Sequence, residues 1–420
     1  MNKKITVLTI SDHPLLPSGV GTQTKYVIEA LLRSGKFDVI SLGGAVKHQD
    51  YTPKLVEGYP GRWEIFPVDN YGDANLIKRF LNERKPDILY FMTDPRFYEW
   101  LWSVDDIVRS SVPMVYYHVW DNYPYPYYNQ RYYESNDVIA SISKVTSDIV
   151  RTVAPRVEEE YVPHAVDSNV FRNKKDSPEY KQLLDNNPTL KDRFVFFWNN
   201  RNARRKQTGS LIHWYKDFLE LENVDRDKVN LFLHTDPDDP HGQPIRFLVD
   251  SLGFKEGEIT LSTTKLPADQ LSYMYNLADC TINISDAEGF GLATLESLSC
   301  ETPIIVNMTG GLQEQVTDGE EWFGIGIEPS SKAIIGSQLV PFIYEDRISK
   351  QDFLDALMKM YKMPTEEREQ LGIRGRQHVE KNYNFENFNK QWVNLMTRTY
   401  ENRGSWENRK NYNNLRVCKL

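Results

Sequence analysis

The 420-residue chain is long enough for two domains of about 200 residues each, and its 40% hydrophobic and 26% charged residues are typical of globular proteins. Its net charge of −9 does not favour a constitutive nucleic-acid-binding protein, which needs a concentrated basic face. The three cysteines, Cys280, Cys300 and Cys418, show no CxxC spacing, which predicts a reduced, cytoplasmic setting. The apolar run at the start is too short for a signal peptide or a membrane span, and no other stretch approaches ~20 apolar residues, so we expect at most peripheral membrane contact.

Short apolar segments in the first part of the chain predict the strands of one sheet. These segments are 5–10, 37–43, 87–92, 112–119 and 137–142. After the first strand we expect a loop over 11–23 and then an amphipathic helix, in which Tyr26, Val27, Ala30 and Leu31 recur at helical spacing. Strands that alternate with helices predict a parallel sheet covered by helices on both faces.

The same pattern begins again in the second half of the chain. The predicted strands are 193–200, 229–235, 258–262, 279–285 and 302–307, with helical runs such as 211–221 and 268–278 between them. The polar segment 173–192 is a candidate linker, and the tail from about 350 is predicted to be helical. We therefore predict an α/β protein with domains over 1–172 and 173–384, whose ligands bind in a cleft at the carboxyl ends of the strands.

The segment DAEGFGLATLESLS, residues 286–299, links a strand to a helix through a tight turn. Gly289 and Gly291 permit the turn and a close approach of the backbone to a ligand. The amides of Phe290, Gly291 and Leu292 are expected at the start of the helix, which is a natural site for an anion.

A glutamate stands on each side of this turn. Glu296 lies about one turn into the predicted helix, where a carboxylate stabilises the helix start by ~0.3–1 kcal/mol or accepts two ribose hydroxyl groups. Glu288 is placed to accept hydroxyl groups of a sugar beyond the phosphates. A capped surface helix after a turn is the simpler interpretation, but the flanking strands favour a binding site.

The sequence EGFGLATLE resembles the Glu-x7-Glu motif of family 4 retaining glycosyltransferases, and the resemblance is strongest over 195–320. It implies a GT-B fold, with two Rossmann-like domains facing a cleft and a tail of about 385–420 that packs back on the first domain. One departure is Glu301, where the family usually has a glycine that closes the helix. Because a non-glycine residue in a left-handed cap costs ~1 kcal/mol, we expect the helix to end differently here.

The segment NNRNARRKQ, residues 199–207, resembles the family's Gly-Arg-Lys segment, although Asn200 replaces the glycine. The resemblance implies that Arg201 and Lys206 grip the donor diphosphate, and fixed cations stabilise the charge that develops on a leaving diphosphate. For Arg204 and Arg205 we expect solvated side chains instead.

Two further segments match the family in part. The sequence SGVG, residues 18–21, resembles the glycine loop after the first strand, which implies that Gly19 and Gly21 let the backbone approach the donor phosphates and the acceptor. The segment 162–171 resembles the domain crossover, with His164 and Ala165 in place of Asn and Gly, which suggests a variant hinge.

His118 ends a predicted strand and matches the family's cleft histidine, which the resemblance implies hydrogen-bonds the donor sugar. The tract 116–133 that surrounds it is dense in aromatic residues. Such rings stack on sugars and bases, or pack a loop beneath the cleft, and the sequence leaves both possibilities open.

The segment HTDPDDPHG, residues 234–242, contains an Asp-x-Asp pattern that is a metal-binding motif in the other large glycosyltransferase fold. The prolines and Gly242 favour a turn instead. We therefore expect no metal and no cofactor.

The resemblance implies an enzyme that moves a sugar, with retention, from a nucleotide-diphospho-sugar such as a UDP- or GDP-sugar to a hydroxyl of a saccharide or glycoconjugate acceptor. In this scheme Glu288, His118, Arg201 and Lys206 are catalytic. The residues 289–292 with Glu296, Gly19 and Gly21 bind the donor. Three alternatives remain: a GT-B-type epimerase or hydrolase, a non-catalytic sugar-nucleotide-binding scaffold, and a transferase that modifies nucleic acid.

Overall fold

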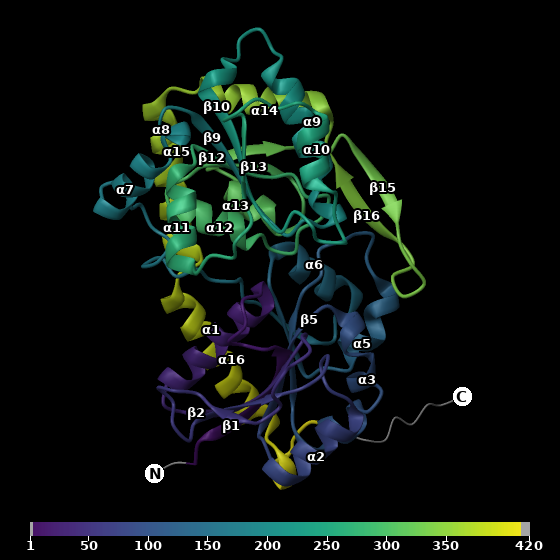
Figure 1. Ribbon diagram of the computed structural model, residues 1–420. Helices are drawn as coiled ribbons and strands as arrows, with labels where there is room; N and C mark the ends of the chain where they lie inside the picture. Colours follow the sequence, from purple (N-terminus) through teal and green to yellow (C-terminus); the bar gives the residue numbers. More distant parts are fainter. Residues whose placement is uncertain (1–2, 413–420) are drawn as a thin grey trace. The chain divides into compact units, whose positions relative to one another are not determined.

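The computed structural model describes residues 3–412, and Figure 1 shows their helices and strands. Residues 3–165 and 385–412 form one compact unit, and residues 166–384 form a second. The end of the predicted tail, with Cys418, lies outside the described residues. None of the helices within residues 3–412 has the length and apolar character that crossing a membrane requires.

The first unit is built on an eight-stranded sheet in the order β3-β4-β2-β1-β5-β6-β7-β8, in which only the β3–β4 pair is antiparallel. The strands are β1 Ile5–Asp12, β2 Phe37–Gly44, β3 Lys54–Leu55, β4 Trp63–Pro67, β5 Ile88–Thr93, β6 Met114–His118, β7 Val138–Ser141 and β8 Glu158–Tyr161. The five predicted strands are confirmed. The strands β3, β4 and β8 were not predicted, because their sequences KL, WEIFP and EEEY lack a continuous apolar run.

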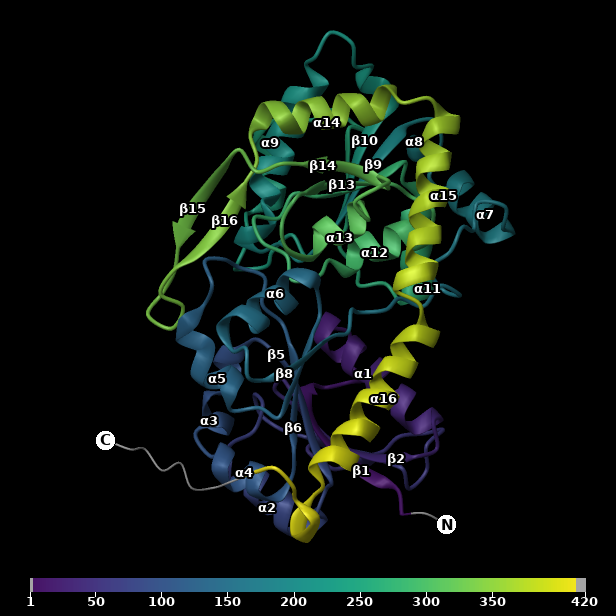
Figure 2. The same ribbon diagram turned by 180° about the vertical axis from the view of Figure 1, so that it is seen from behind.

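Helices cover this sheet. They are α1 Gly19–Arg33, α2 Ala74–Arg84, α3 Glu99–Trp102, α4 Asp105–Ser111, α5 Gln130–Glu134, α6 Lys144–Val153 and α16 Phe385–Arg403, with 3-10 turns η1 Pro95–Phe97, η2 Tyr127–Asn129 and η6 Trp406–Asn408. The helix α16 returns from the end of the chain to this unit, as Figure 2 shows. Its buried Trp392 meets Tyr90 and Tyr117 edge to face, with ring centroids 5.5 and 4.8 Å apart.

The second unit contains a parallel six-stranded sheet in the order β11-β10-β9-β12-β13-β14. Its strands are β9 Phe194–Asn199, β10 Val229–His234, β11 Ile259–Ser262, β12 Cys280–Asn283, β13 Ile304–Asn307 and β14 Gly324–Ile327, and a separate antiparallel hairpin joins β15 Ser331–Ile335 to β16 Ile343–Arg347. The five predicted strands are again confirmed. The strand β14 has the sequence GIGI. It was not predicted, because glycine has a low propensity for strands.

Two helices of the second unit, α7 and α8, lie in the candidate linker, which is therefore not an extended segment. The helices of this unit are α7 Pro178–Asn186, α8 Pro188–Lys191, α9 Thr208–Leu219, α10 Ile245–Ser251, α11 Ala268–Leu277, α12 Leu292–Ser299, α13 Gln313–Val316, α14 Lys350–Lys362 and α15 Thr365–Asn382, with 3-10 turns η3 Arg204–Lys206, η4 Arg226–Lys228 and η5 Gly310–Leu312. A continuous core of buried aromatic and aliphatic side chains joins the sheet to α9 and α14.

The end of α12 differs from the expectation. Glu301 adopts the left-handed conformation with φ +62°, and the helix closes with the two hydrogen bonds of a Schellman motif. The amide of Glu301 donates to the carbonyl of Leu298, and the amide of Thr302 donates to that of Ser297, both at 3.0 Å. The prediction that the helix would end without a left-handed residue was wrong, because Glu301 adopts this conformation in spite of its side chain.

This strain predicts a difference between two substitutions at position 301. Both Glu301→Ala and Glu301→Gly remove the carboxylate, which accepts a hydrogen bond from Asn173 at 2.7 Å. Only the glycine variant also relieves the left-handed backbone, so we expect it to be more stable than the alanine variant by about 1 kcal/mol. Urea denaturation of the two proteins measures this difference, and equal stabilities would contradict it.

Candidate active site

The turn between β12 and α12 is shaped by two glycines from different segments. Gly291 has φ +94°, and a Cβ at that position would lie 2.5 Å from Leu312 Cδ2. Gly311 lies against the other side of the turn, where an added Cβ would be 2.6 Å from Phe290 Cα. The predicted tight turn is thus confirmed, and Gly311 is a part of it that the motif did not reveal.

Buried hydrogen bonds hold this turn rigid. The side-chain amide of Gln315 donates to the carbonyls of Phe290 at 2.7 Å and Gly291 at 3.2 Å, and its oxygen accepts from the Thr294 hydroxyl at 2.6 Å. The amide of Gly311 donates to the carbonyl of Glu288 at 3.0 Å. Because these bonds lie within the protein, the start of α12 is preorganised before any ligand binds.

Glu288 forms a buried ion pair with Lys206 at the carboxyl end of the sheet. Glu288 is 8% exposed and Lys206 is 7% exposed, and the ammonium group donates directly to the carboxylate. Burial alone would raise the pKa of Glu288, but Lys206 and Arg205 outweigh it and lower the pKa to about 2. The carboxylate is therefore charged at neutral pH.

The side chains of Arg204 and Arg205 are 57% and 43% exposed, as expected of solvated residues, but each also has a partner within the protein. Arg205 donates to the carbonyl of Ala287 at 2.5 Å and lies 3.5 Å from the Glu288 carboxylate. Arg204 forms a two-pronged ion pair with Glu345 in β16, a residue 141 positions later in the chain. The partners of Arg204 and Arg205 could not be predicted from the local sequence, because both contacts depend on the tertiary fold.

Arg201 and Lys206 bond to different carboxylates. The guanidinium of Arg201 donates to Asp239 at 2.5 Å and lies 2.9 Å from the ring of His241, while 61% of its side chain is exposed. The hydrogen bond from Arg201 lowers the pKa of Asp239 well below its usual value. The predicted turn over 236–242 is confirmed, since Asp236 and Asp239 each accept backbone amides within it.

Glu296 lies in the second turn of α12 and is half-buried. The hydroxyl of Tyr275 donates to its carboxylate at 2.7 Å, and that hydroxyl in turn accepts from Asn199 at 2.8 Å. Burial raises the pKa of Glu296 to about 7, although the bond from Tyr275 lowers it in part. Asn199 ends β9, so its place at the carboxyl edge of the sheet could have indicated it from the sequence.

A buried carboxylate that the sequence analysis missed joins the basic loop to the hairpin. Asp286 accepts from the Gln207 amide at 2.5 Å, and its backbone amide donates to Arg205 at 2.8 Å. The amide of Asp346 in β16 donates to its carbonyl at 2.9 Å. Burial raises the pKa of Asp286 to about 6. The hairpin therefore braces the same loop that contains Lys206.

Two polar side chains beside this loop have buried atoms that no described residue pairs with. They are the Nδ2 of Asn200, which stands where the family has glycine, and the Oγ1 of Thr208 at the start of α9. Buried polar groups are almost always satisfied in folded proteins.

His118 ends β6 in the first unit and is fully buried. Its Nε2 hydrogen-bonds the hydroxyl of Tyr133 at 2.8 Å, whereas its Nδ1 has no partner among the described residues. Burial lowers the pKa of His118 to about 3, so the ring is neutral at physiological pH.

Gly19 and Gly21 lie inside the first turn of α1, not in a loop as predicted. The Ser18 side chain caps this helix by accepting the Gly21 amide at 3.0 Å. A Cβ at Gly21 would lie 2.9 Å from the carbonyl oxygen of His13, so this glycine serves the packing of the preceding loop. That capped amide is already bonded within the protein.

The aromatic tract over 116–133 divides into two groups. Tyr116, Tyr117 and Tyr133 are buried in the core of the first unit, which supports the packing interpretation for them. Tyr123 and Tyr125 both donate to Asp148, at 2.8 and 2.9 Å, near the surface. His164, at the start of the predicted hinge segment, contacts the Tyr117 hydroxyl of this unit at 2.7 Å.

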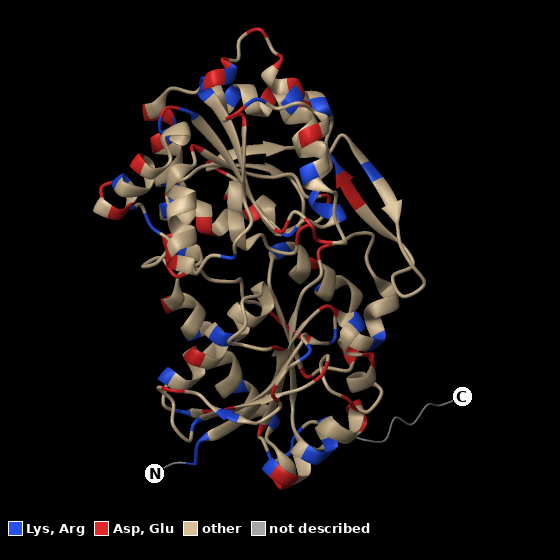
Figure 3. Cartoon of the chain, viewed as in Figure 1, with Lys and Arg blue, Asp and Glu red and all other residues tan. Residues whose placement is uncertain are grey.

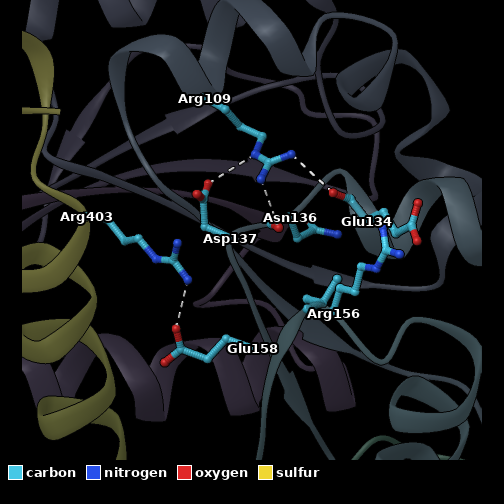
Figure 4. A pocket seen from close by; sticks show the side chains of 8 residues that line it. Arg109, Glu134, Asn136, Asp137, Arg156, Glu158 and Arg403 are labelled. Atoms are coloured by element: carbon cyan, nitrogen blue, oxygen red, sulfur yellow. Dashed lines mark hydrogen bonds and ion pairs between the residues drawn. The ribbon is translucent and has the colours of Figure 1, made fainter. Parts of the chain in front are cut away.

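A cavity of about 400 Å³ lies elsewhere in the first unit, and Figure 4 shows the side chains around it. Asp137 precedes β7 and Glu158 begins β8, so the cavity lies at the amino ends of these strands, opposite the edge where ligands of parallel sheets bind. Its lining residues are Arg109, Glu134, Asn136, Asp137, Arg156, Val157, Glu158 and Arg403. None of the predicted site residues lines it.

Comparison with known proteins relates part of the chain to a protein family. Residues 239–378 match the family described as glycosyl transferases group 1. The chain is 37% identical over 99 residues to a D-inositol 3-phosphate glycosyltransferase of Acidothermus cellulolyticus, covering 23% of this chain and 22% of that protein. It is 38% identical over 74 residues to a protein of the same name from Thermomonospora curvata, covering 17% of each. The chain thus matches about a fifth of the length of these curated relatives.

Solved structures match over nearly the whole chain. A sucrose-phosphate synthase from Thermosynechococcus elongatus aligns with a TM-score of 0.75 at 16% identity, covering 95% of this chain and 100% of that one. HepE from Anabaena, solved with UDP and glucose, aligns with a TM-score of 0.68 at 15% identity, covering 94% and 100%. At these identities the likeness concerns the fold.

The predicted GT-B fold, with its two Rossmann-like units, is confirmed by these neighbours and by the two sheets, whose strands are parallel except for the β3–β4 pair. Residues 239–378, which match the model of glycosyl transferases group 1, include the Glu288 turn and α12.

Proposed function

We propose that the protein is a retaining glycosyltransferase, related to family 4, that transfers a sugar from a nucleotide-diphospho-sugar to a hydroxyl group. The observation that supports this most is the buried Glu288–Lys206 pair beside the rigid Gly291 turn, with Glu296 in the following helix. One polypeptide segment thereby offers a carboxylate for sugar hydroxyls, backbone amides for phosphates and a second carboxylate for ribose.

The proposed chemistry needs no separate general base. The acceptor oxygen bonds to the anomeric carbon while the bond from that carbon to the β-phosphate oxygen breaks, and the acceptor proton passes to this phosphate oxygen. Lys206 and the amides of 290–292 stabilise the developing negative charge. Arg201 is proposed to stabilise the same negative charge. For this, its guanidinium group must either leave Asp239 or bind the phosphate through the N–H groups that remain exposed.

His118 is proposed to position the donor sugar. Its unpaired Nδ1 is a buried atom that a sugar hydroxyl would satisfy, and the neutral ring accepts or donates one hydrogen bond without adding charge. Gly19 is proposed to lie near the acceptor, and Gly21 to shape the backbone there.

The donor class is proposed from a structural neighbour. HepE was solved with UDP and glucose, so a UDP-sugar is the first donor to test. The experiment is nucleotide release from UDP-, GDP-, ADP- and dTDP-sugars by the wild-type protein and by Glu296→Ala. We expect slow release from one donor that is lost in the variant. No release and no binding with any donor would contradict the proposal.

The same experiment separates the alternatives. An epimerase or hydrolase would consume the donor at full rate without an acceptor, and a scaffold would bind it without acceptor-dependent release. A nucleic-acid acceptor would make binding steeply dependent on salt. The net charge of −9 does not favour this last alternative, and in the view of Figure 3 the Lys and Arg positions are interspersed with Asp and Glu.

Transfer is proposed to proceed without a metal ion, because Lys206 and the helix amides supply the positive charge. Within residues 3–412 no group of three or more His, Cys, Asp and Glu side chains is arranged to hold a metal. We expect EDTA to leave the rate of nucleotide release unchanged within about twofold. Loss of activity with EDTA that magnesium or manganese restores would contradict this. A cytoplasmic setting is part of the same proposal, in keeping with the free thiols of Cys280 and Cys300.

A further inference from the structure

Two loops of the first unit bring aromatic rings together at one edge of its sheet, and a third loop bonds to them. His13 follows β1 and His48 follows β2, while Tyr51 donates from its hydroxyl to Asp69, which follows β4, at 2.6 Å. The three strands are neighbours, so these loops meet at the carboxyl edge. The ring centroids are 5.6 Å apart for His13 and His48, and 5.6 Å for His48 and Tyr51. We call these three residues the ring cluster.

Large apolar side chains on the same loops are exposed. Leu15 is 49% exposed and Leu16 is 38% exposed after β1, and Val46 is 41% exposed after β2. Tyr51 of the ring cluster is 45% exposed. Neighbouring apolar side chains that remain exposed in a folded protein are typical of binding surfaces.

Backbone hydrogen bonds hold these loops in place. The amide of His13 donates to Gly44 at 3.1 Å, and the amide of Leu16 donates to His13 at 3.0 Å. The His48 ring contacts the carbonyl of Gly43 at 2.9 Å. A Cβ on Gly43 would lie 2.7 Å from the His13 ring, so the glycine lets the ring lie flat on β2. The surface is therefore formed before a ligand arrives.

The charges on these loops do not suit an anion. The loops 13–18, 45–53 and 68–73 contain one lysine, Lys47, and three aspartates, Asp50, Asp69 and Asp73. Lys54 in β3 lies 3.9 Å from Asp50, which offsets its charge. A phosphate needs cations with unused hydrogen-bond donors, and here carboxylates outnumber lysines.

We propose that the ring cluster with Leu15, Leu16 and Val46 binds the acceptor, and that this acceptor is a sugar joined to an uncharged apolar group. Rings and aliphatic side chains bury such a group without a charged partner. This inference rests on the proposed transferase function. It also separates the chain from its curated relatives, which are named for an inositol 3-phosphate.

The test is acceptor choice at saturating donor. Octyl and p-nitrophenyl glycosides of several hexoses are compared with the free hexoses and their 6-phosphates. We expect the KM of the apolar glycosides to be at least about tenfold lower. The double variant Leu15→Ser/Leu16→Ser should raise that KM about fivefold and leave the donor KM unchanged. The matched control is Phe247→Ser in α10, which is 67% exposed in the second unit and should change neither value.

A preference for the sugar 6-phosphates, or an unchanged KM in the double variant, would overturn the inference. Where no glycoside is turned over, saturation-transfer NMR detects binding directly: signals from the octyl or aryl group with wild type that the double variant loses support the inference, and their absence overturns it. Transfer to a sugar phosphate would overturn this inference alone. Failure to bind or release any donor would instead contradict the transferase function.

Discussion

Replacing Glu288 by glutamine is expected to lower kcat/KM for the donor by about a thousandfold. The carboxylate is charged, because Lys206 and Arg205 hold its pKa at about 2 against the effect of burial. The neutral amide would neither keep Lys206 in place nor form charge-assisted hydrogen bonds to sugar hydroxyls. Initial rates of nucleotide release with the preferred donor measure this loss, and retention of more than a tenth of the wild-type kcat/KM would contradict it.

A second variant separates chemistry from folding. Glu288→Gln removes the carboxylate that pairs with the buried ammonium of Lys206, which costs ~3 kcal/mol of stability. Adding Lys206→Met removes the buried positive charge while keeping most of the length of the side chain, so we expect most of this stability to return. Activity should stay lost in the double variant. Recovery of activity together with stability would show that the pair is structural only.

The sequence analysis found the strands that are apolar and missed those that are not. Buried strands of a parallel sheet read as continuous apolar runs, as in VPMVYYHV and RFVFFWNN, so β6 and β9 were predictable. The edge strand β8, with the sequence EEEY, shows no such run, because its glutamates pair with Arg398, Arg403 and Arg151. Two of these arginines, Arg398 and Arg403, lie more than 230 residues further along the chain.

The part of the candidate site that lies within one short segment was predictable from the sequence. The turn between Glu288 and Glu296 lies within one short segment. The positions of its two glycines therefore predicted the tight turn, in which Gly291 has a positive φ. The partners of the basic loop were not predictable, since Asp239 and Glu345 approach it from 38 and 141 residues away. Hairpin β15–β16, which supplies Glu345, has no pattern that links it to the motif.

Affinity for the intact donor is expected to fall as the pH drops below about 7, and Glu296 is the cause. Burial raises the pKa of its carboxyl group to about 7, so it is ionised above that pH and protonated below it. In the proposed site each oxygen of the carboxylate accepts one ribose hydroxyl group, and protonation turns one of these oxygens into a donor. Binding should therefore weaken as the pH falls, by up to about tenfold for each pH unit below 7. The donor Kd, measured by calorimetry from about pH 8 to 5.5, reports this change.

Three variants identify the titrating group. Glu296→Gln should bind the donor weakly at every pH, with no slope. Tyr275→Phe removes the hydrogen bond that lowers the pKa of Glu296, so its inflection should move to higher pH. Asp286→Asn, which removes the other buried carboxyl group with a pKa raised toward neutrality, should keep the wild-type slope. The intact donor is used because its diphosphate, esterified at both ends, does not titrate in this range. A wild-type Kd that stays constant over the range would contradict the assignment of Glu296 to the ribose.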